Sequence, residues 1–92
     1  MKYEIELTKD ALDDIKQLKK GREVQALKKL NSLFSELEDH PTTGTGKPEQ
    51  LRENLSGKWS RRITEKHRLI YEIHEDTIKV LILKTYGHYN DK

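Results

Sequence analysis

The stretch that decides the fold is WSRRITEKHRLIYEIHEDTIKVLILKTY, residues 59–86. Apolar and polar side chains alternate along three runs in it, residues 59–64, 67–74 and 77–86, as they do in half-buried strands. Short polar segments separate the runs, and the second of these is His74-Glu75-Asp76. Strands joined by short turns pair as antiparallel neighbours, so we expect three adjacent antiparallel strands here.

One further strand and two helices are predicted before this stretch. Residues 3–7 alternate as a strand, and Thr8 then caps a helix that ends at Gly21. One face of that helix carries Ala11, Leu12, Ile15 and Leu18. A second helix stops before His40-Pro41 and carries Val24, Leu27, Leu30, Phe34 and Leu37 at three- and four-residue steps. The order β-α-α-β-β-β predicts an α+β fold in which a two-helix hairpin packs on one face of a mostly antiparallel sheet.

Length and composition limit the class of protein. A chain of 92 residues favours one domain, spanning residues 1–92. There is no cysteine, which excludes disulfides and thiolate metal sites and favours a reducing cytoplasm. No apolar run approaches the ~20 residues of a membrane-spanning helix. The alternating N-terminus is also unlike a signal peptide, so we expect no membrane partner.

Positive charge is concentrated in one part of the chain. The net charge is +2, but residues 44–68 hold seven lysines and arginines against three acids, whereas residues 1–40 hold eight against nine. A cationic segment on a nearly neutral body suggests an anionic partner such as nucleic acid. The alternative is a solvated surface of mixed charge.

Two arginines from neighbouring strands stand out. Strand alternation places Arg62 and Arg68 on the sheet face opposite the helices, provided that the register is suitable, while Trp59, Arg61 and Ile63 point to the other face. Two guanidinium groups on an open face can hold a phosphate, since each matches two phosphate oxygens. The alternative is that they pair with nearby acids, namely Glu65, Glu72 or Glu75.

Two further residues carry suitable chemistry for acid–base catalysis. Glu49 follows a loop rich in proline and glycine, and it is either a general base or a solvated loop carboxylate. His88, followed by Tyr89, comes after the last predicted strand, and it is either a proton donor or a mobile polar side chain. The other histidines, His40, His67 and His74, look like ordinary polar positions without the spacing of metal ligands, so no metal site is expected.

The segment GKPEQLRENLSGKWSRRITEKHRLIYEI, residues 46–73, strongly resembles the signature of the YoeB/Txe family of bacterial toxins, within the RelE-like superfamily. The family elements Gly-Lys-Pro-Glu-x-Leu, Asn-Leu-Ser-Gly-x-Trp-Ser-Arg-Arg-Ile and His-Arg-Leu-x-Tyr are all present. The chain also carries the family's His-Tyr pair near its end, and the order of the elements agrees.

This resemblance implies the toxin of a type II toxin–antitoxin system, an endoribonuclease that cuts messenger RNA in the A site of the 70S ribosome without a metal or other cofactor. By motif position it implies Glu49 as general base and His88 as general acid, with Tyr89 beside it. Arg62 and Arg68 correspond to the phosphate-binding and transition-state-stabilising arginines, and Arg52 to a basic RNA-contacting residue. The implied partner is a YefM/Phd-type antitoxin, and a homodimer is a further expected assembly. The alternative is a non-catalytic toxin of the ParE type that inhibits DNA gyrase.

Overall fold

The computed structural model describes residues 2–52 and 57–87, so the predicted site residues His88 and Tyr89 lie outside the described residues. The elements are β1 (Glu4–Leu7), α1 (Lys9–Lys20), α2 (Val24–Asp39), β2 (Glu49–Gln50), β3 (Lys58–Arg62), β4 (Arg68–His74) and β5 (Lys79–Lys84). The predicted order is confirmed, with one addition. The two-residue strand β2 is too short to leave an alternating pattern, and the sequence did not predict it.

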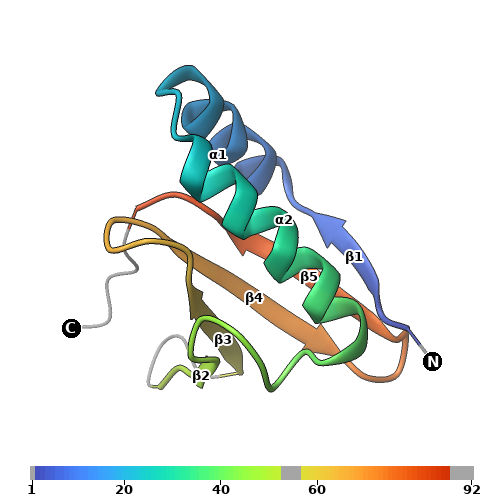
Figure 1. The fold of residues 1–92 in the computed structure, drawn as a ribbon. Helices are drawn as coiled ribbons and strands as arrows, with labels where there is room; N and C mark the ends of the chain where they lie inside the picture. The colour runs from blue at the N-terminus through green and yellow to red at the C-terminus, as the bar shows by residue number, and fades with distance from the viewer. Residues whose placement is uncertain (1, 53–56, 88–92) are drawn as a thin grey trace.

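The strands form one sheet in the order β1-β5-β4-β3-β2. The pairs β3–β4 and β4–β5 are antiparallel, as predicted, and the additional strand β2 pairs antiparallel with β3, whereas β1 lies parallel to β5 at one edge. Figure 1 shows both helices on the same side of this sheet. Two strands that pair in parallel need a long crossover connection between them. The chain between β1 and β5 includes both helices and so provides that crossover for the parallel pair.

The helix ends have local causes. Thr8 caps α1, and its side-chain oxygen accepts a hydrogen bond from the Ala11 backbone N–H at 3.1 Å. Helix α2 ends at Asp39, with His40 as its C-terminal cap, directly before Pro41. Both boundaries follow the prediction. The end of α2 does so because a residue before proline disfavours the helical conformation.

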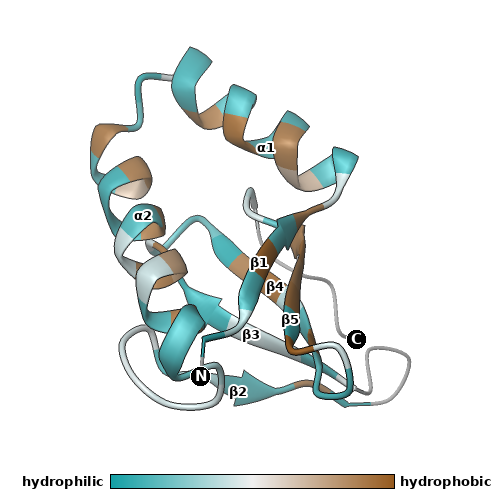
Figure 2. Ribbon diagram, turned by 90° about the vertical axis from the view of Figure 1, so that its right-hand side faces the viewer, coloured by the Kyte–Doolittle hydropathy of each residue, from teal (hydrophilic) through white to brown (hydrophobic). Residues whose placement is uncertain are grey.

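The core lies between the helices and the covered face of the sheet, where the apolar stripes of both helices meet the strands (Figure 2). Two residues of the predicted stripes lie elsewhere, since Leu12 and Val24 are 50% and 55% exposed. Leu12 stands to one side of the buried α1 residues Ala11 and Leu18, and Val24 is the first residue of α2. The buried stripe of α2 instead consists of Ala26, Leu30, Leu33 and Leu37.

The sheet face opposite the helices is less open than the sequence suggested. Ser60 and Ile70, which are register partners near its centre, are 0% and 4% exposed. Arg62, at the end of the same strand as Ser60, is exposed. Accessible cations are thus found at the end of the β3–β4 pair. Neither α1 nor α2, the helices among the described residues, is long and apolar enough to cross a membrane.

Candidate active site

The strand register brings three predicted site residues onto one face of the sheet. Arg62, the last residue of β3, is the direct register partner of Arg68, the first residue of β4. Glu49, the first residue of β2, is the partner of Ser60, which lies two residues before Arg62 on β3. Cross-strand partners share a face, and so do residues two apart on a strand. Glu49, Arg62 and Arg68 therefore lie together, opposite the helices.

The spacing of these residues suits a single nucleotide. Strands about 4.8 Å apart and a rise of about 3.3 Å per residue put the Cα atoms of Glu49 and Arg68 about 12 Å apart. The long arginine side chain and the shorter glutamate side chain bridge much of that distance. A carboxylate and two guanidinium groups can thus reach one phosphate and the ribose that precedes it.

The surroundings of Arg62 argue against simple charge pairing on the surface. In the described part of the chain no carboxylate forms an ion pair with the exposed Arg62. Glu72 instead lies 3.4 Å from Lys58 Nζ and 3.0 Å from His74 Nε2. Glu75 accepts a hydrogen bond from the Tyr3 hydroxyl at 2.6 Å. The two acids Glu72 and Glu75 therefore have partners of their own.

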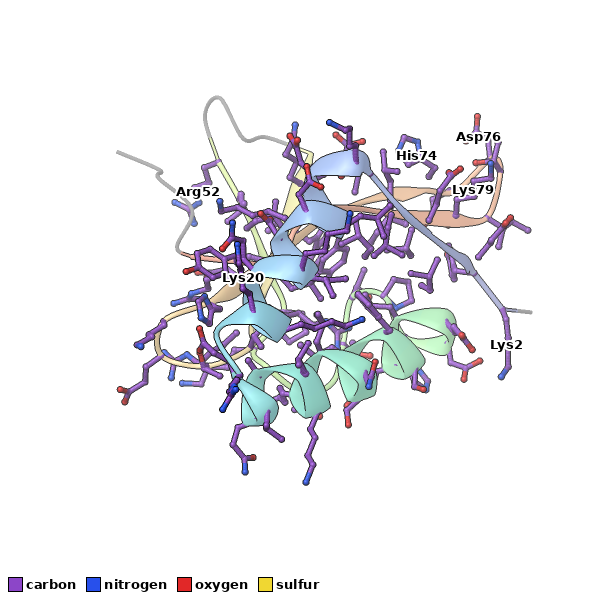
Figure 3. The ribbon with its side chains drawn as sticks, turned by 90° about the horizontal axis from the view of Figure 1, so that it is seen from above. Lys2, Lys20, Arg52, His74, Asp76 and Lys79 are labelled. Carbon is purple, nitrogen blue, oxygen red and sulfur yellow. The ribbon has the colours of Figure 1, made fainter. Side chains whose placement is uncertain are left out.

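Arg52 and Gly87 are the remaining described residues that bear on the site. Figure 3 shows Arg52 at the end opposite His74, Asp76 and Lys79. Gly87, the residue before His88, accepts a hydrogen bond from the Arg68 backbone N–H at 2.9 Å. Gly87 therefore lies beside Arg68, and His88 and Tyr89 themselves are outside the described residues.

His67 has a more specific setting than the ordinary polar position expected for it. It is 3% exposed, and its Nδ1 atom accepts a hydrogen bond from the Gly87 backbone N–H at 2.8 Å. The ring proton must then be on Nε2, which lies 3.0 and 3.1 Å from the two carboxylate oxygens of Glu23. The Tyr86 ring lies 4.6 Å away, centroid to centroid. His67 therefore joins the helix hairpin to the segment before His88.

Within residues 2–52 and 57–87, no group of three or more histidine, aspartate or glutamate side chains is arranged to hold a metal ion. The reactive groups on this face are a carboxylate and two guanidinium groups. Such a set can accept a proton and stabilise negative charge on phosphate oxygens.

Comparisons with known proteins agree with the fold and the motif. Residues 7–89 match the family model described as YoeB-like toxin of bacterial type II toxin-antitoxin system. The chain is 50% identical to Toxin YoeB of Escherichia coli K12 over 54 residues, which are 59% of this chain and 64% of that protein. The match thus spans less than two thirds of that relative's length.

Solved structures extend the similarity over almost the whole chain. The YoeB/ParE toxin from Agrobacterium tumefaciens superposes with a TM-score of 0.86 at 29% identity, covering 94% of this chain and 99% of that one. The YoeB-YefM complex from Staphylococcus aureus gives 0.78 at 31% identity, covering 97% and 100%. The YoeB dimer from the same organism gives 0.81, also at 31% and with the same coverage.

The fold, with two helices on a mostly antiparallel sheet, and the sheet face that carries Glu49, Arg62 and Arg68 together define a small toxin-like protein. The chain belongs to the YoeB-like toxin family of bacterial type II toxin-antitoxin systems.

Proposed function

We propose that this protein is an endoribonuclease toxin that cleaves messenger RNA in the A site of the 70S ribosome, and so acts in the cytoplasm. The observation that carries the proposal is the register, which puts Glu49 on the same sheet face as the paired arginines Arg62 and Arg68. Family membership supports it, because these residues fall at the motif positions on which the resemblance rests.

The reaction follows from the chemistry of RNA. The Glu49 carboxylate takes the proton of a ribose 2′-hydroxyl, and the 2′-oxygen attacks the adjacent phosphorus. Arg62 and Arg68 stabilise the charge that builds on the phosphate oxygens. The bond from phosphorus to the 5′-oxygen breaks, and His88 gives that oxygen a proton. The products are a 2′,3′-cyclic phosphate and a 5′-hydroxyl, and DNA is inert because it lacks the attacking group.

The remaining predicted residues have supporting roles. Arg52 contacts the RNA backbone near the general base Glu49, and Tyr89 stands next to the general acid His88 in the sequence. The proposed inhibitor is a YefM/Phd-type antitoxin whose acidic segment covers the cationic end of the sheet, in keeping with the YoeB-YefM complex solved for the Staphylococcus aureus relative. A homodimer is proposed on the same basis.

The test is primer extension on messenger RNA from cells after induction of the wild-type protein, Glu49→Gln, Arg68→Ala or His88→Gln. Codon-phased breaks are expected with the wild type, and a loss of about 10²–10⁴-fold is expected when the base or the acid is removed. Each variant must still bind the antitoxin encoded by the neighbouring open reading frame, because such binding shows that the variant is folded. Growth arrest without RNA breaks would refute the proposal and favour inhibition of gyrase.

A further inference from the structure

Arg61 differs from its neighbour Arg62 in being completely buried. All five of its N–H groups have acceptors in the described part of the chain. Nε donates to the Tyr71 hydroxyl at 3.1 Å, Nη1 to Glu36 Oε1 at 2.9 Å and to the Thr45 carbonyl at 3.2 Å, and Nη2 to the carbonyls of Thr43, at 2.7 Å, and His40. Since a guanidinium has only five such donors, none is left for RNA.

The acceptors of Arg61 belong mainly to the loop that follows α2. Besides the three loop carbonyls, the Glu36 side chain accepts a hydrogen bond from the Thr45 backbone N–H at 2.8 Å. The Tyr71 hydroxyl donates to the Pro41 carbonyl at 2.7 Å. Residues 40–45 are therefore wrapped around one guanidinium group. A Cβ atom at Gly44 would lie 2.3 Å from Glu36 Oε1, so this close approach needs glycine.

This wrapped loop leads directly to Glu49. The Gly46 carbonyl accepts a hydrogen bond from the Arg62 backbone N–H at 2.7 Å, which fastens the loop beside β3 (Figure 1). Glu49 follows three residues later, in a strand with only two register pairs, and both residues of that strand are exposed. So short an edge strand has little stability of its own. The place of Glu49 therefore depends on how the preceding loop is held.

We propose that Arg61 is a positioning residue for Glu49, holding residues 40–45 so that β2 presents the carboxylate on the same face as Arg62 and Arg68. The proposal rests on the proposed function, in which Glu49 is the base. Lysine cannot replace Arg61, because an ammonium group has three donors on a point charge rather than five in a planar fork. An error of 1 Å in placing a catalytic group can cost about 10²-fold in rate.

A double-mutant cycle tests this assignment. Single-turnover cleavage on programmed ribosomes is measured for the wild type, Arg61→Lys, Glu49→Gln and the double variant. We expect Arg61→Lys to lower the rate at least tenfold, and the double variant to cleave within about threefold of Glu49→Gln alone, since the positioning has no effect once the base is gone. Rate losses that multiply in the double variant would overturn the inference.

A second measurement does not depend on activity. The Leu51 backbone N–H donates to the Lys58 carbonyl at 2.9 Å and so reports on the β2–β3 pairing. In Arg61→Lys the hydrogen exchange of Leu51 should speed up at least tenfold more than that of the β4 amides, which report on opening of the whole domain. Unchanged exchange at Leu51 in a folded variant would also overturn the inference. If Arg61→Lys does not fold, Gly44→Ala disturbs the same loop while residue 61 stays an arginine, and the same results are expected.

Ile82→Val is the matched control for loss of stability. Ile82 is buried in β5 and lies outside residues 40–45, the loop wrapped around Arg61. It should lower the melting temperature but leave the cleavage rate and Leu51 exchange at wild-type values. The outcomes also separate the two proposals. Full activity in Glu49→Gln refutes the proposed function, whereas an inactive Glu49→Gln with multiplying losses refutes only the role of Arg61.

Discussion

Replacing Tyr71 by phenylalanine tests the buried polar cluster directly. Tyr71 is 0% exposed, and its hydroxyl makes two hydrogen bonds. It donates to the Pro41 carbonyl at 2.7 Å and accepts from Arg61 Nε at 3.1 Å. Phenylalanine keeps the ring and nearly all of the volume, so the change removes the hydroxyl and leaves the packing of the core in place.

The magnitude follows from the two groups that lose their partner. A buried donor or acceptor left unsatisfied costs about 1–3 kcal/mol. Part of this is offset, because burying the hydroxyl of Tyr71 itself no longer costs desolvation energy. We expect the free energy of unfolding to fall by about 2 kcal/mol. In a domain of this size that corresponds to a drop in melting temperature of about 8–16 °C.

Urea unfolding followed by circular dichroism measures this difference at a common m-value. Tyr3→Phe is the matched control, because the Tyr3 hydroxyl also makes a hydrogen bond, to Glu75, but in an exposed position. It should change the free energy of unfolding by less than about 0.5 kcal/mol. A loss that small for Tyr71→Phe would refute the idea that the cluster around Arg61 is energetically important.

The same variant should alter the response to alkaline pH. Burial raises the pKa of Tyr71, although the neighbouring Arg61 opposes the effect. Above the ordinary tyrosine pKa of about 10, the unfolded chain releases this proton while the folded protein retains it. Stability therefore falls as pH rises past that value. Between neutral pH and pH values above about 10, the free energy of unfolding of Tyr71→Phe should fall less than that of the wild type. An equal fall would contradict a raised pKa for the buried Tyr71 hydroxyl.

Three further predictions concern other parts of the site. Gly46→Ala places a Cβ atom 2.8 Å from the Arg62 carbonyl oxygen. In urea unfolding it should therefore cost about 1–3 kcal/mol more than Gly57→Ala, where φ is similar but the new Cβ would meet no other atom of the described residues within 4 Å. Hydrogen bonds from Thr45 and the nearby Arg61 lower the pKa of Glu36 in the folded protein. The stability that the ionised carboxylate contributes is therefore lost as the pH falls below the pKa of Glu36 in the unfolded chain and through its lower pKa in the folded protein. Glu36→Gln should make the free energy of unfolding depend less steeply on pH in this acidic range. Arg62→Ala should reduce the salt dependence of single-stranded RNA binding, in fluorescence anisotropy, by about 0.7 in the log–log slope, whereas Lys28→Ala on the exposed side of α2 should not.

Each of these has a result that would count against it. Equal costs for the two glycine variants would mean that the loop moves away from β3 without penalty. An unchanged acid limb in Glu36→Gln would place the acid-sensitive stability in other carboxylates. Equal salt slopes for Arg62→Ala and Lys28→Ala would mean that Arg62 does not contact phosphate.

Much of the secondary structure was predictable, because its causes are local. Alternation identified the strands β3, β4 and β5, and Pro41 ended α2 where expected. The failures have local explanations too. Leu12 and Val24 fit the helical period but lie at the flank and the end of the buried stripes. The strand β2 spans two residues, which is too few for any periodicity.

The candidate site divides in the same way. The motif selected Glu49, Arg62 and Arg68, and alternation placed both arginines opposite the helices. Only the register showed that Arg62 faces Arg68 and that Glu49 is opposite Ser60, since pairing between strands depends on residues far apart in the chain.

The sequence by itself determined the type and order of the elements other than β2, the side of the strand on which each β3 residue stands, and the family. The tertiary structure alone decided what the two consecutive arginines do. Arg62 remains exposed, whereas Arg61 is buried against carbonyl groups that come from a loop 16 to 21 residues earlier. The physical reason is that a buried charge must have all its donors satisfied, and the acceptors for Arg61 come together only when α2, the loop and β3 have packed.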